Sequence, residues 1–172
     1  PRLLRLLHAL PLRKFHRGHC QQVIHRDPDL GTLPVLHCWP QDGGRFFTLP
    51  LVFTREPGKR RQNVGMYRMQ VLDRQTTAMH WHKHKDGSAL FDAYKAGGRR
   101  MPVSVALGCD PAITYAATAP LPKGLDEMMF AGFLRRANVR MVKSITNELL
   151  VPDSAEFVLE GYVDPDEALV LE

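Results

Sequence analysis

The sequence predicts an α+β fold in which a largely antiparallel sheet forms a barrel or split barrel with flanking helices. Short segments rich in β-branched and aromatic residues follow one another along the chain, with turn signals such as 42–44 and 57–58 between them. Helical patterns interrupt this series only at 87–96, after Asp110 and at 125–136. Strands and helices therefore do not alternate regularly, as they would around a parallel sheet.

The first half of the chain carries several predicted strands. Residues 1–16 place leucines at the spacing of a short amphipathic helix, which Pro11 ends, and residues 17–32 are polar with a turn at 27–31. Residues 63–72 alternate apolar and polar side chains, as a half-buried strand does. The predicted strands in this half are residues 33–39, 45–54, 63–72 and 78–84.

The second half mixes helices with further strands. Residues 87–96 predict a helix that ends at Gly97 and Gly98. Asp110 suits a helix N-cap with Pro111 in the first turn, and residues 125–136 are the longest amphipathic pattern in the chain. The remaining predicted strands are residues 101–107, 139–143, 148–151 and 156–163.

The charge and composition favour a small anionic ligand over nucleic acid. The formal net charge is +5, but the cations occur in scattered small groups such as 59–61, 99–100 and 135–136. They are not accompanied by the regular aromatic residues of a single-strand platform or by a recognition-helix pattern. The chain contains no apolar run of membrane-spanning length and no signal-peptide pattern, so we expect a cytoplasmic protein.

The three cysteines and the two ends of the chain add further expectations. Cys20, Cys38 and Cys109 are widely spaced, which argues against a disulfide framework or a zinc site, and Cys38 and Cys109 are predicted to be packed thiols. The chain starts at Pro1 and stops within a strand-like segment at 169–172. We therefore expect it to be an excerpt of a longer protein.

Three histidines mark a first candidate site. His80, His82 and His84 alternate, so in a strand they project from the same face. That face could bind a metal, pair with a phosphate or simply be solvated, and the spacing leaves these alternatives open. Hard oxygen ligands such as Asn63 and Glu127 would suit Mn²⁺ or Mg²⁺ bridging to a phosphate.

Arg68 and Glu127 each have two interpretations. Arg68 lies in an otherwise apolar strand pattern, and a buried arginine needs an anionic partner. The partner could be a structural carboxylate, or the carboxylate of a substrate held by the planar guanidinium fork. Glu127 follows Asp126 at the start of the longest helical pattern, where acidic residues are favourable without any further role.

Four segments together resemble the UbiD family, whose members are carboxy-lyases that use prenylated FMN. The segments are Asn63 to Arg68, Met79 to His84, Pro102 to Ala112 and Val151 to Tyr162, and they occur in the family's order. The resemblance extends from about Asp29 to the last residue. It implies an enzyme of three parts, with a flavin-binding split β-barrel between flanking α/β regions. Residues 1–30 would be the end of a preceding region or a linker, and residues 31–172 the prenylated-FMN-binding domain, cut at its C-terminal end.

The resemblance also implies the site residues. The expected ligands of a divalent metal, Mn²⁺ with K⁺ as an optional second ion, are Asn63, His84 and Glu127. The expected flavin contacts are Met66, Tyr67, Arg68, His80, Trp81, His82 and Lys85. Arg68 and Glu172 match catalytic positions of the family, and the proton-donating acid would follow residue 172.

The implied reaction is the reversible, non-oxidative decarboxylation of an aromatic or α,β-unsaturated carboxylic acid. The motif at 63–68 is similar to the quinone-biosynthesis branch, which acts on a prenylated 4-hydroxybenzoate. The alternatives are a phenolic-acid decarboxylase, or a flavin- and metal-binding module without turnover. The expected partners are an aromatic acid substrate, a flavin prenyltransferase that supplies the cofactor, and further copies of the full-length protein in a homo-oligomer. A peripheral position at the inner membrane is a further expectation of this interpretation.

Overall fold

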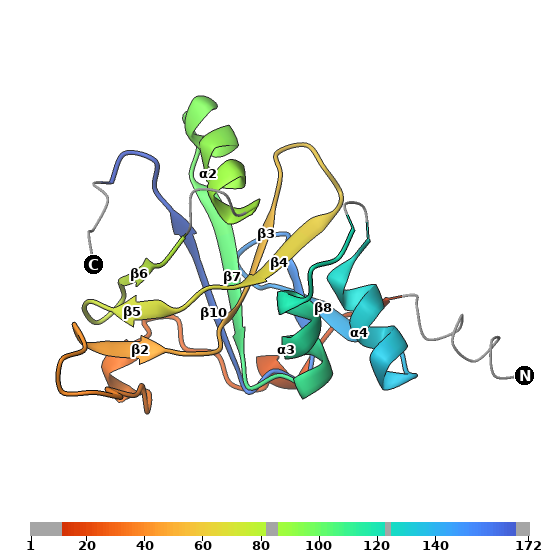
Figure 1. Cartoon of the computed structure of the whole chain (residues 1–172), viewed down its shortest axis with the longest axis horizontal. Coiled ribbons are helices and arrows are strands. Elements are labelled where there is room, and N and C mark those ends of the chain that lie inside the picture. Colours follow the sequence, from red (N-terminus) through yellow and green to blue (C-terminus); the bar gives the residue numbers. More distant parts are fainter. Residues whose placement is uncertain (1–11, 82–85, 123–124, 168–172) are drawn as a thin grey trace, which may run out of the picture.

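The computed structural model describes residues 12–81, 86–122 and 125–167 of the chain (Figure 1). Three α-helices lie within these ranges, and two short 3₁₀ helices, η1 (His19–Gln21) and η2 (Leu30–Thr32), precede the main sheet. The α-helices are α2 (Asp86–Ala96), α3 (Pro111–Thr118) and α4 (Glu127–Arg135). The strands are β1 (Arg13–Phe15), β2 (Arg45–Phe47), β3 (Leu51–Arg55), β4 (Gln62–Met66), β5 (Met69–Val71), β6 (Thr77–Met79), β7 (Met101–Leu107), β8 (Arg140–Lys143), β9 (Leu150–Pro152) and β10 (Phe157–Val163).

The strands form three sheets. A four-stranded sheet has the order β10-β7-β3-β4, and the two three-stranded sheets have the orders β2-β5-β6 and β1-β8-β9. Among the described strands only β1 and β8 pair in parallel, and every other named pair is antiparallel. The predicted α+β fold with largely antiparallel sheets is therefore confirmed. The described strands do not close into a single barrel.

Two predicted strands are each divided between two sheets. Residues 45–54 split into β2 and β3 around Pro50, and residues 63–72 split into β4 and β5 at Tyr67 and Arg68. In both cases the chain passes from one sheet to the other at the break, as strands do at the corners of packed sheets. The prediction of two continuous strands was therefore wrong. The sequence gives no sign of the two breaks, because the apolar alternation continues across each of them.

The N-terminal predictions were less accurate. The predicted helix at 1–16 falls mostly outside the described residues, and Arg13–Phe15 form strand β1 instead. The predicted strand at 33–39 contributes only an isolated bridge between Leu36 and Phe46. Of the predicted strand at 78–84, Ala78 and Met79 belong to β6 (Thr77–Met79), His80 and Trp81 lie beyond its end, and 82–84 fall outside the described residues.

The helix caps agree with the sequence. Asp110 accepts a hydrogen bond from the Ala112 amide at 2.8 Å and caps α3, two residues after Gly108 turns the chain with a φ of 67°. The Asp126 carboxylate accepts hydrogen bonds from the Met128 and Met129 amides. Asp126 is therefore the N-cap of α4, and Glu127 is its first helical residue.

The main sheet has an apolar core on each face. Leu51 and Phe53 of β3 pack in the core beneath α3 and α4, whereas Val52 points to the opposite core beneath α2. β3 lies between β7 and β4, so its apolar residues are covered on both faces and Phe53 is completely buried. Within the described ranges, no helix is long and apolar enough to span a membrane.

The cysteines differ in their environments. Cys38 is exposed, so the prediction that it packs in an apolar environment was wrong, whereas Cys109 is partly buried beside the core under α3 and α4. Burial, with a smaller contribution from Cys20, raises the pKa of the Cys109 thiol to about 12. The thiol therefore stays protonated at neutral pH.

This difference predicts unequal thiol reactivity. Because the thiolate is the reactive form, iodoacetamide at pH 8 should modify Cys38 at least about ten times faster than Cys109. Peptide mass mapping over time measures both rates in one sample, and denatured protein, in which both thiols are exposed, serves as the control. Equal rates in the native protein would contradict the buried environment of Cys109.

Candidate functional site

The candidate site begins with two adjacent polar side chains on β3 and β4. Thr54 and Asn63 are directly opposite each other in the antiparallel register, so their side chains project from the same face of the sheet. Val52 of that face belongs to the core under α2, which places Thr54 and Asn63 on the α2 side. Thr54 is almost completely buried, with 1% of its surface exposed.

Both side chains carry a buried polar atom without a partner. Of the described residues, only Thr54, Asn63 and Trp81 have such an atom, namely Oγ1, Nδ2 and Nε1. Buried polar groups are normally hydrogen-bonded, and leaving one unpaired costs about 1–3 kcal/mol. Two such atoms on directly opposite residues indicate a place where a further group binds.

Glu127 comes to the same strand from α4. The guanidinium of Arg61, directly before β4, donates a hydrogen bond to the Leu125 carbonyl and lies 3.9 Å from Glu127 Oε1. These contacts hold the start of α4 against the start of β4, two residues from Asn63. Because β4 is the outer strand of its sheet, groups from both faces can meet along its free edge. The Glu127 side chain is 16% exposed.

The two residues fit a divalent cation chemically. When its buried Nδ2–H₂ group faces the protein, the Asn63 amide presents Oδ1 to a ligand. An amide oxygen and a carboxylate are hard ligands that suit Mn²⁺ or Mg²⁺. The part of the chain that the structure describes contains no group of three His, Cys, Asp or Glu residues that could hold a metal. A cation site here therefore needs the asparagine, or a further ligand beyond these residues.

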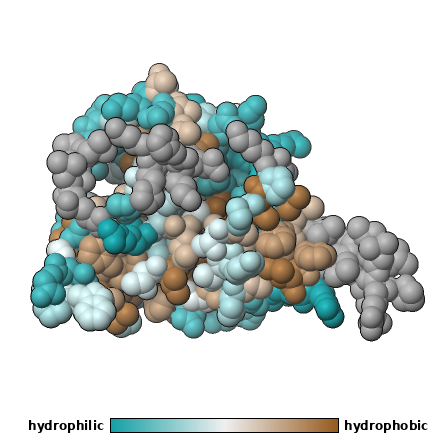
Figure 2. Space-filling model, viewed as in Figure 1, coloured by the Kyte–Doolittle hydropathy of each residue, from teal (hydrophilic) through white to brown (hydrophobic). Residues whose placement is uncertain are grey.

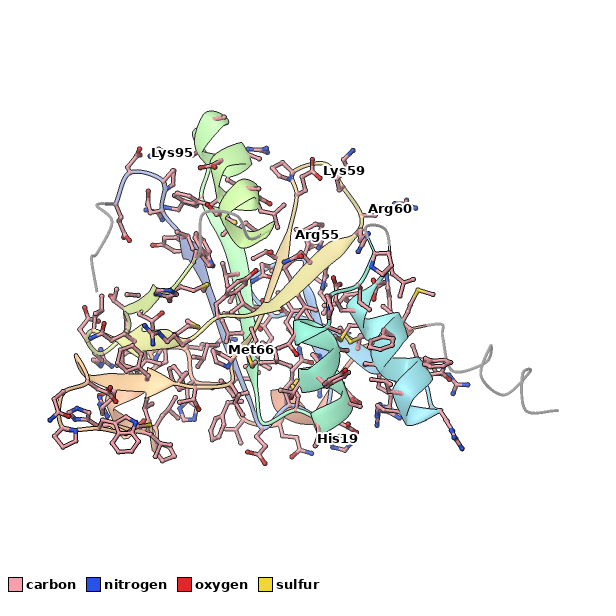
Figure 3. All side chains as sticks on the ribbon, viewed as in Figure 1. His19, Arg55, Lys59, Arg60, Met66 and Lys95 are labelled. Carbon is pink, nitrogen blue, oxygen red and sulfur yellow. The ribbon has the colours of Figure 1, made fainter. Side chains whose placement is uncertain are left out.

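The Tyr67 ring lies against Gly65, on the face of β4 that also carries Asn63. A Cβ atom at Gly65 would lie 2.5 Å from the Tyr67 hydroxyl and 2.6 Å from its ring carbons. Glycine at this position therefore allows the Tyr67 ring to lie over the strand, two residues from Asn63. Met66 points the other way and packs against the core under α3 and α4, where Figure 3 shows it beside α3. Of these two expected flavin contacts, Tyr67 shares the face of Asn63 and Met66 does not.

Arg68 is exposed, which corrects the expectation that it is buried. Its guanidinium carbon lies 5.7 Å from the centre of the Phe46 ring, at the break between β4 and β5. The Arg68 carbonyl accepts a hydrogen bond from the His80 amide at 3.1 Å. Arg68 and His80 are therefore opposite each other in the extended β5–β6 hairpin, and the structure brings these two predicted site residues together.

Trp81 provides the third unpaired buried group. Its ring is 5.6 Å from the Phe91 ring of α2, and its indole Nε1–H is buried without an acceptor. Indole N–H groups usually find a partner when they are buried. Trp81 packs against the core under α2, which is also the face of Thr54 and Asn63.

Four predicted site residues, His82, His84, Lys85 and Glu172, lie outside the described residues. The alternating face of histidines, the third expected metal ligand and the second expected catalytic residue therefore remain predictions. Thr54 was not predicted. The available signal was a polar residue at the end of the apolar run Leu51–Phe53, although threonine is also common in ordinary strands.

Two surface hollows lie elsewhere. Cavities of about 260 Å³ and 400 Å³ share His19 and Arg140 in their walls. Figure 3 shows His19 at the opposite edge of the molecule from Lys59 and Arg60 in the β3–β4 turn. The Arg140 guanidinium is already paired with Asp153 at 2.8 Å and stacks on Phe15. These hollows are separate from the candidate site.

Comparison with known proteins identifies the family. The UbiD family model, described as the 3-octaprenyl-4-hydroxybenzoate carboxy-lyase Rift-related domain, matches residues 13–172. The chain belongs to the UbiD family. An uncharacterized protein of Archaeoglobus fulgidus is 48% identical over 159 residues, which cover 92% of this chain and 33% of that protein. The chain thus spans about a third of the length of this relative.

Solved UbiD structures share the fold. An evolved dimeric form of the UbiD-class enzyme HmfF from Pelotomaculum thermopropionicum, in complex with prFMN, matches with a TM-score of 0.84 and 26% identity. The match covers 96% of this chain and 40% of the HmfF chain. Vanillic acid decarboxylase of Sedimentibacter hydroxybenzoicus in closed form matches with a TM-score of 0.86 and 27% identity, over 96% of this chain and 37% of that chain. The recognition of the UbiD family from the sequence is confirmed.

Proposed function

We propose that the protein containing this chain is a UbiD-class decarboxylase that uses prenylated FMN, and that this chain forms its cofactor-binding part. The observation that carries the proposal is the likeness of 96% of the chain to HmfF, which was solved in complex with prFMN. The unpaired buried amide of Asn63 supports it, because a buried polar group without a protein partner marks a ligand position.

Asn63 and Glu127 have the first role in this proposal. Together with His84 they would hold a divalent cation, with Mn²⁺ proposed and K⁺ as an optional second ion, and the cation would neutralise the flavin phosphate. Arg61 lies 3.9 Å from Glu127 and adds positive charge beside the same anionic group. When bound, prenylated FMN supplies the electron sink for the departing CO₂. Tyr67, His80, Trp81 and the predicted contacts His82 and Lys85 would form the wall of its binding site, and Met66, which packs on the opposite face of β4, would support the strand from behind.

Arg68 would hold the substrate. Arg68 is an exposed residue at the break between β4 and β5, and its planar guanidinium fork matches a carboxylate in two-point contact. Fixing the carboxylate in this way aligns the bond to be broken. Glu172 and a proton-donating acid after residue 172 would complete the catalytic group.

We propose a prenylated 4-hydroxybenzoate as the substrate, in quinone biosynthesis, with a phenolic acid as the alternative. The resemblance of residues 63–68 favours the first, and the likeness to vanillic acid decarboxylase favours the second. Competition between the two acids in one assay would distinguish them.

The direct test uses the full-length protein co-produced with a flavin prenyltransferase. We expect a flavin absorption spectrum, prenylated FMN in the extracted cofactor and CO₂ release from one of the two acids. Protein produced without the prenyltransferase is the control and should release no CO₂. A full-length protein that carries prenylated FMN and releases CO₂ from neither acid would contradict the proposed substrate class.

A second candidate is that this chain alone binds flavin and metal without turnover. The observation that favours it is that the chain spans about a third of its curated relatives. An assay of the chain beside the full-length protein, at equal flavin content, decides between the two.

The full-length protein is also proposed to form a homo-oligomer. Figure 2 shows apolar residues gathered over α3 and α4. The exposed apolar side chains of these two helices are Tyr115, Met129, Phe133 and Leu134. A contiguous exposed apolar surface is typical of a protein contact. Mass measurement by light scattering would test the oligomer.

A further inference from the structure

Thr54 is in an unusual position for a residue with no assigned role. It lies in a strand whose preceding residues, Leu51 to Phe53, are all apolar and buried, and it is itself 1% exposed. A valine of the same shape would satisfy this position without a polar atom. The Thr54 hydroxyl instead remains buried and without a partner, directly opposite the equally unpaired amide of Asn63.

We propose that Thr54 is a positioning residue that orients the Asn63 amide toward a bound cation. The inference rests on the proposed function, in which Asn63 Oδ1 is a ligand. When Oδ1 faces a cation, the Nδ2–H₂ group on the other side of the amide needs an acceptor. The Thr54 hydroxyl oxygen is the acceptor that the strand register places opposite it.

The geometry permits this contact. The Cβ atoms of directly opposite residues in an antiparallel pair lie about 4.5–5.5 Å apart, so rotation about χ1 of either side chain can bring hydroxyl and amide together. The hydroxyl can accept from Nδ2 and still donate its own proton. Groups of this kind, which orient a metal ligand without touching the metal, typically change metal affinity by about 10–100-fold when they are removed.

The test compares three variants of the full-length protein. Thr54→Val keeps the shape and removes the hydroxyl, Thr54→Ser keeps the hydroxyl, and Asn63→Ala removes the ligand itself. Each is produced without the prenyltransferase, dialysed against a chelator, and titrated with Mn²⁺ followed by electron paramagnetic resonance. We expect Thr54→Val to weaken Mn²⁺ binding by about 10-fold or more, and Thr54→Ser to remain within about 3-fold of the wild type.

The melting temperature of the metal-free protein gives an independent readout. Because Thr54→Val removes an unsatisfied buried hydroxyl, it should leave the melting temperature of the metal-free protein unchanged or raise it. A purely structural role for the hydroxyl would lower it instead. A lowered melting temperature, a failure to fold, or equal loss of Mn²⁺ binding in both Thr54 variants would overturn the inference.

The remaining outcomes separate this inference from the proposed function. Wild-type Mn²⁺ affinity in Thr54→Val, with binding lost in Asn63→Ala, would overturn the role of Thr54 and leave Asn63 as a ligand. Wild-type affinity in Asn63→Ala would overturn the cation site itself, and the inference with it.

Discussion

Replacing Asn63 with alanine in the full-length protein should abolish stoichiometric binding of the divalent cation and the flavin. The Asn63 amide has a buried atom without a protein partner, and Arg61 holds Glu127 beside the same strand. Removal of a ligand should weaken metal binding by on the order of 100-fold, because even outer groups that support a ligand contribute about 10–100-fold. Metal content by mass spectrometry and flavin absorbance of the purified, co-produced protein measure the two losses.

The controls for this experiment use exposed side chains of the same chemistry. Glu127→Gln should resemble Asn63→Ala, whereas Glu148→Gln changes a carboxylate that is 76% exposed and paired with Lys143. Gln75→Ala removes an exposed side-chain amide that donates a hydrogen bond to the Asp27 carboxylate. Both control variants should keep wild-type metal and flavin. Full occupancy in Asn63→Ala and Glu127→Gln would show that the two residues are not ligands.

Replacing Phe53 with alanine should have the largest effect on stability. Phe53 is completely buried in the central strand β3, in the core beneath α3 and α4. Removal of a fully buried phenylalanine typically costs about 3–5 kcal/mol, because apolar contacts are lost and a cavity remains. That is a large share of the roughly 5–15 kcal/mol that stabilises a typical domain. Hydrogen exchange of the β3 and β7 amides in the full-length protein should accelerate by on the order of 100-fold or more.

Phe157→Ala is the matched control for this substitution. Phe157 lies at the start of β10 and is 44% exposed, so its removal leaves no enclosed cavity. Exchange of the same amides should change by less than about 10-fold in this variant. Equal acceleration in the two variants would contradict the position of the core.

The sequence was most informative where a local interaction determines the structure. The cap of α3 at Asp110 and strand β7 were predicted closely, because a capping side chain and an apolar run act within a few residues. The breaks at Pro50 and Tyr67 could not be predicted, since they depend on which distant strand each half pairs with. β2 and β5 pair with each other, whereas β3 and β4 form a separate pair.

At the candidate site, too, local patterns were informative and features that depend on distant strand pairing were not. Asn63 and Glu127 were proposed from the resemblance, and the structure links their two elements through Arg61. The burial of Arg68 was predicted from an apolar pattern, but the residue lies at the break between sheets and is exposed. Thr54 was missed because only the pairing of β3 with β4 places it opposite Asn63.

The most direct test of the cation and flavin site is a crystal structure of the full-length protein, co-produced with a flavin prenyltransferase and grown with Mn²⁺. The anomalous signal of manganese locates the ion without reference to the protein. We predict that it lies about 2.0–2.2 Å from Asn63 Oδ1 and a Glu127 oxygen, with His84 and a flavin phosphate as further ligands. Prenylated FMN bound with no ion beside Asn63 and Glu127, or an ion held by other residues, would contradict this assignment.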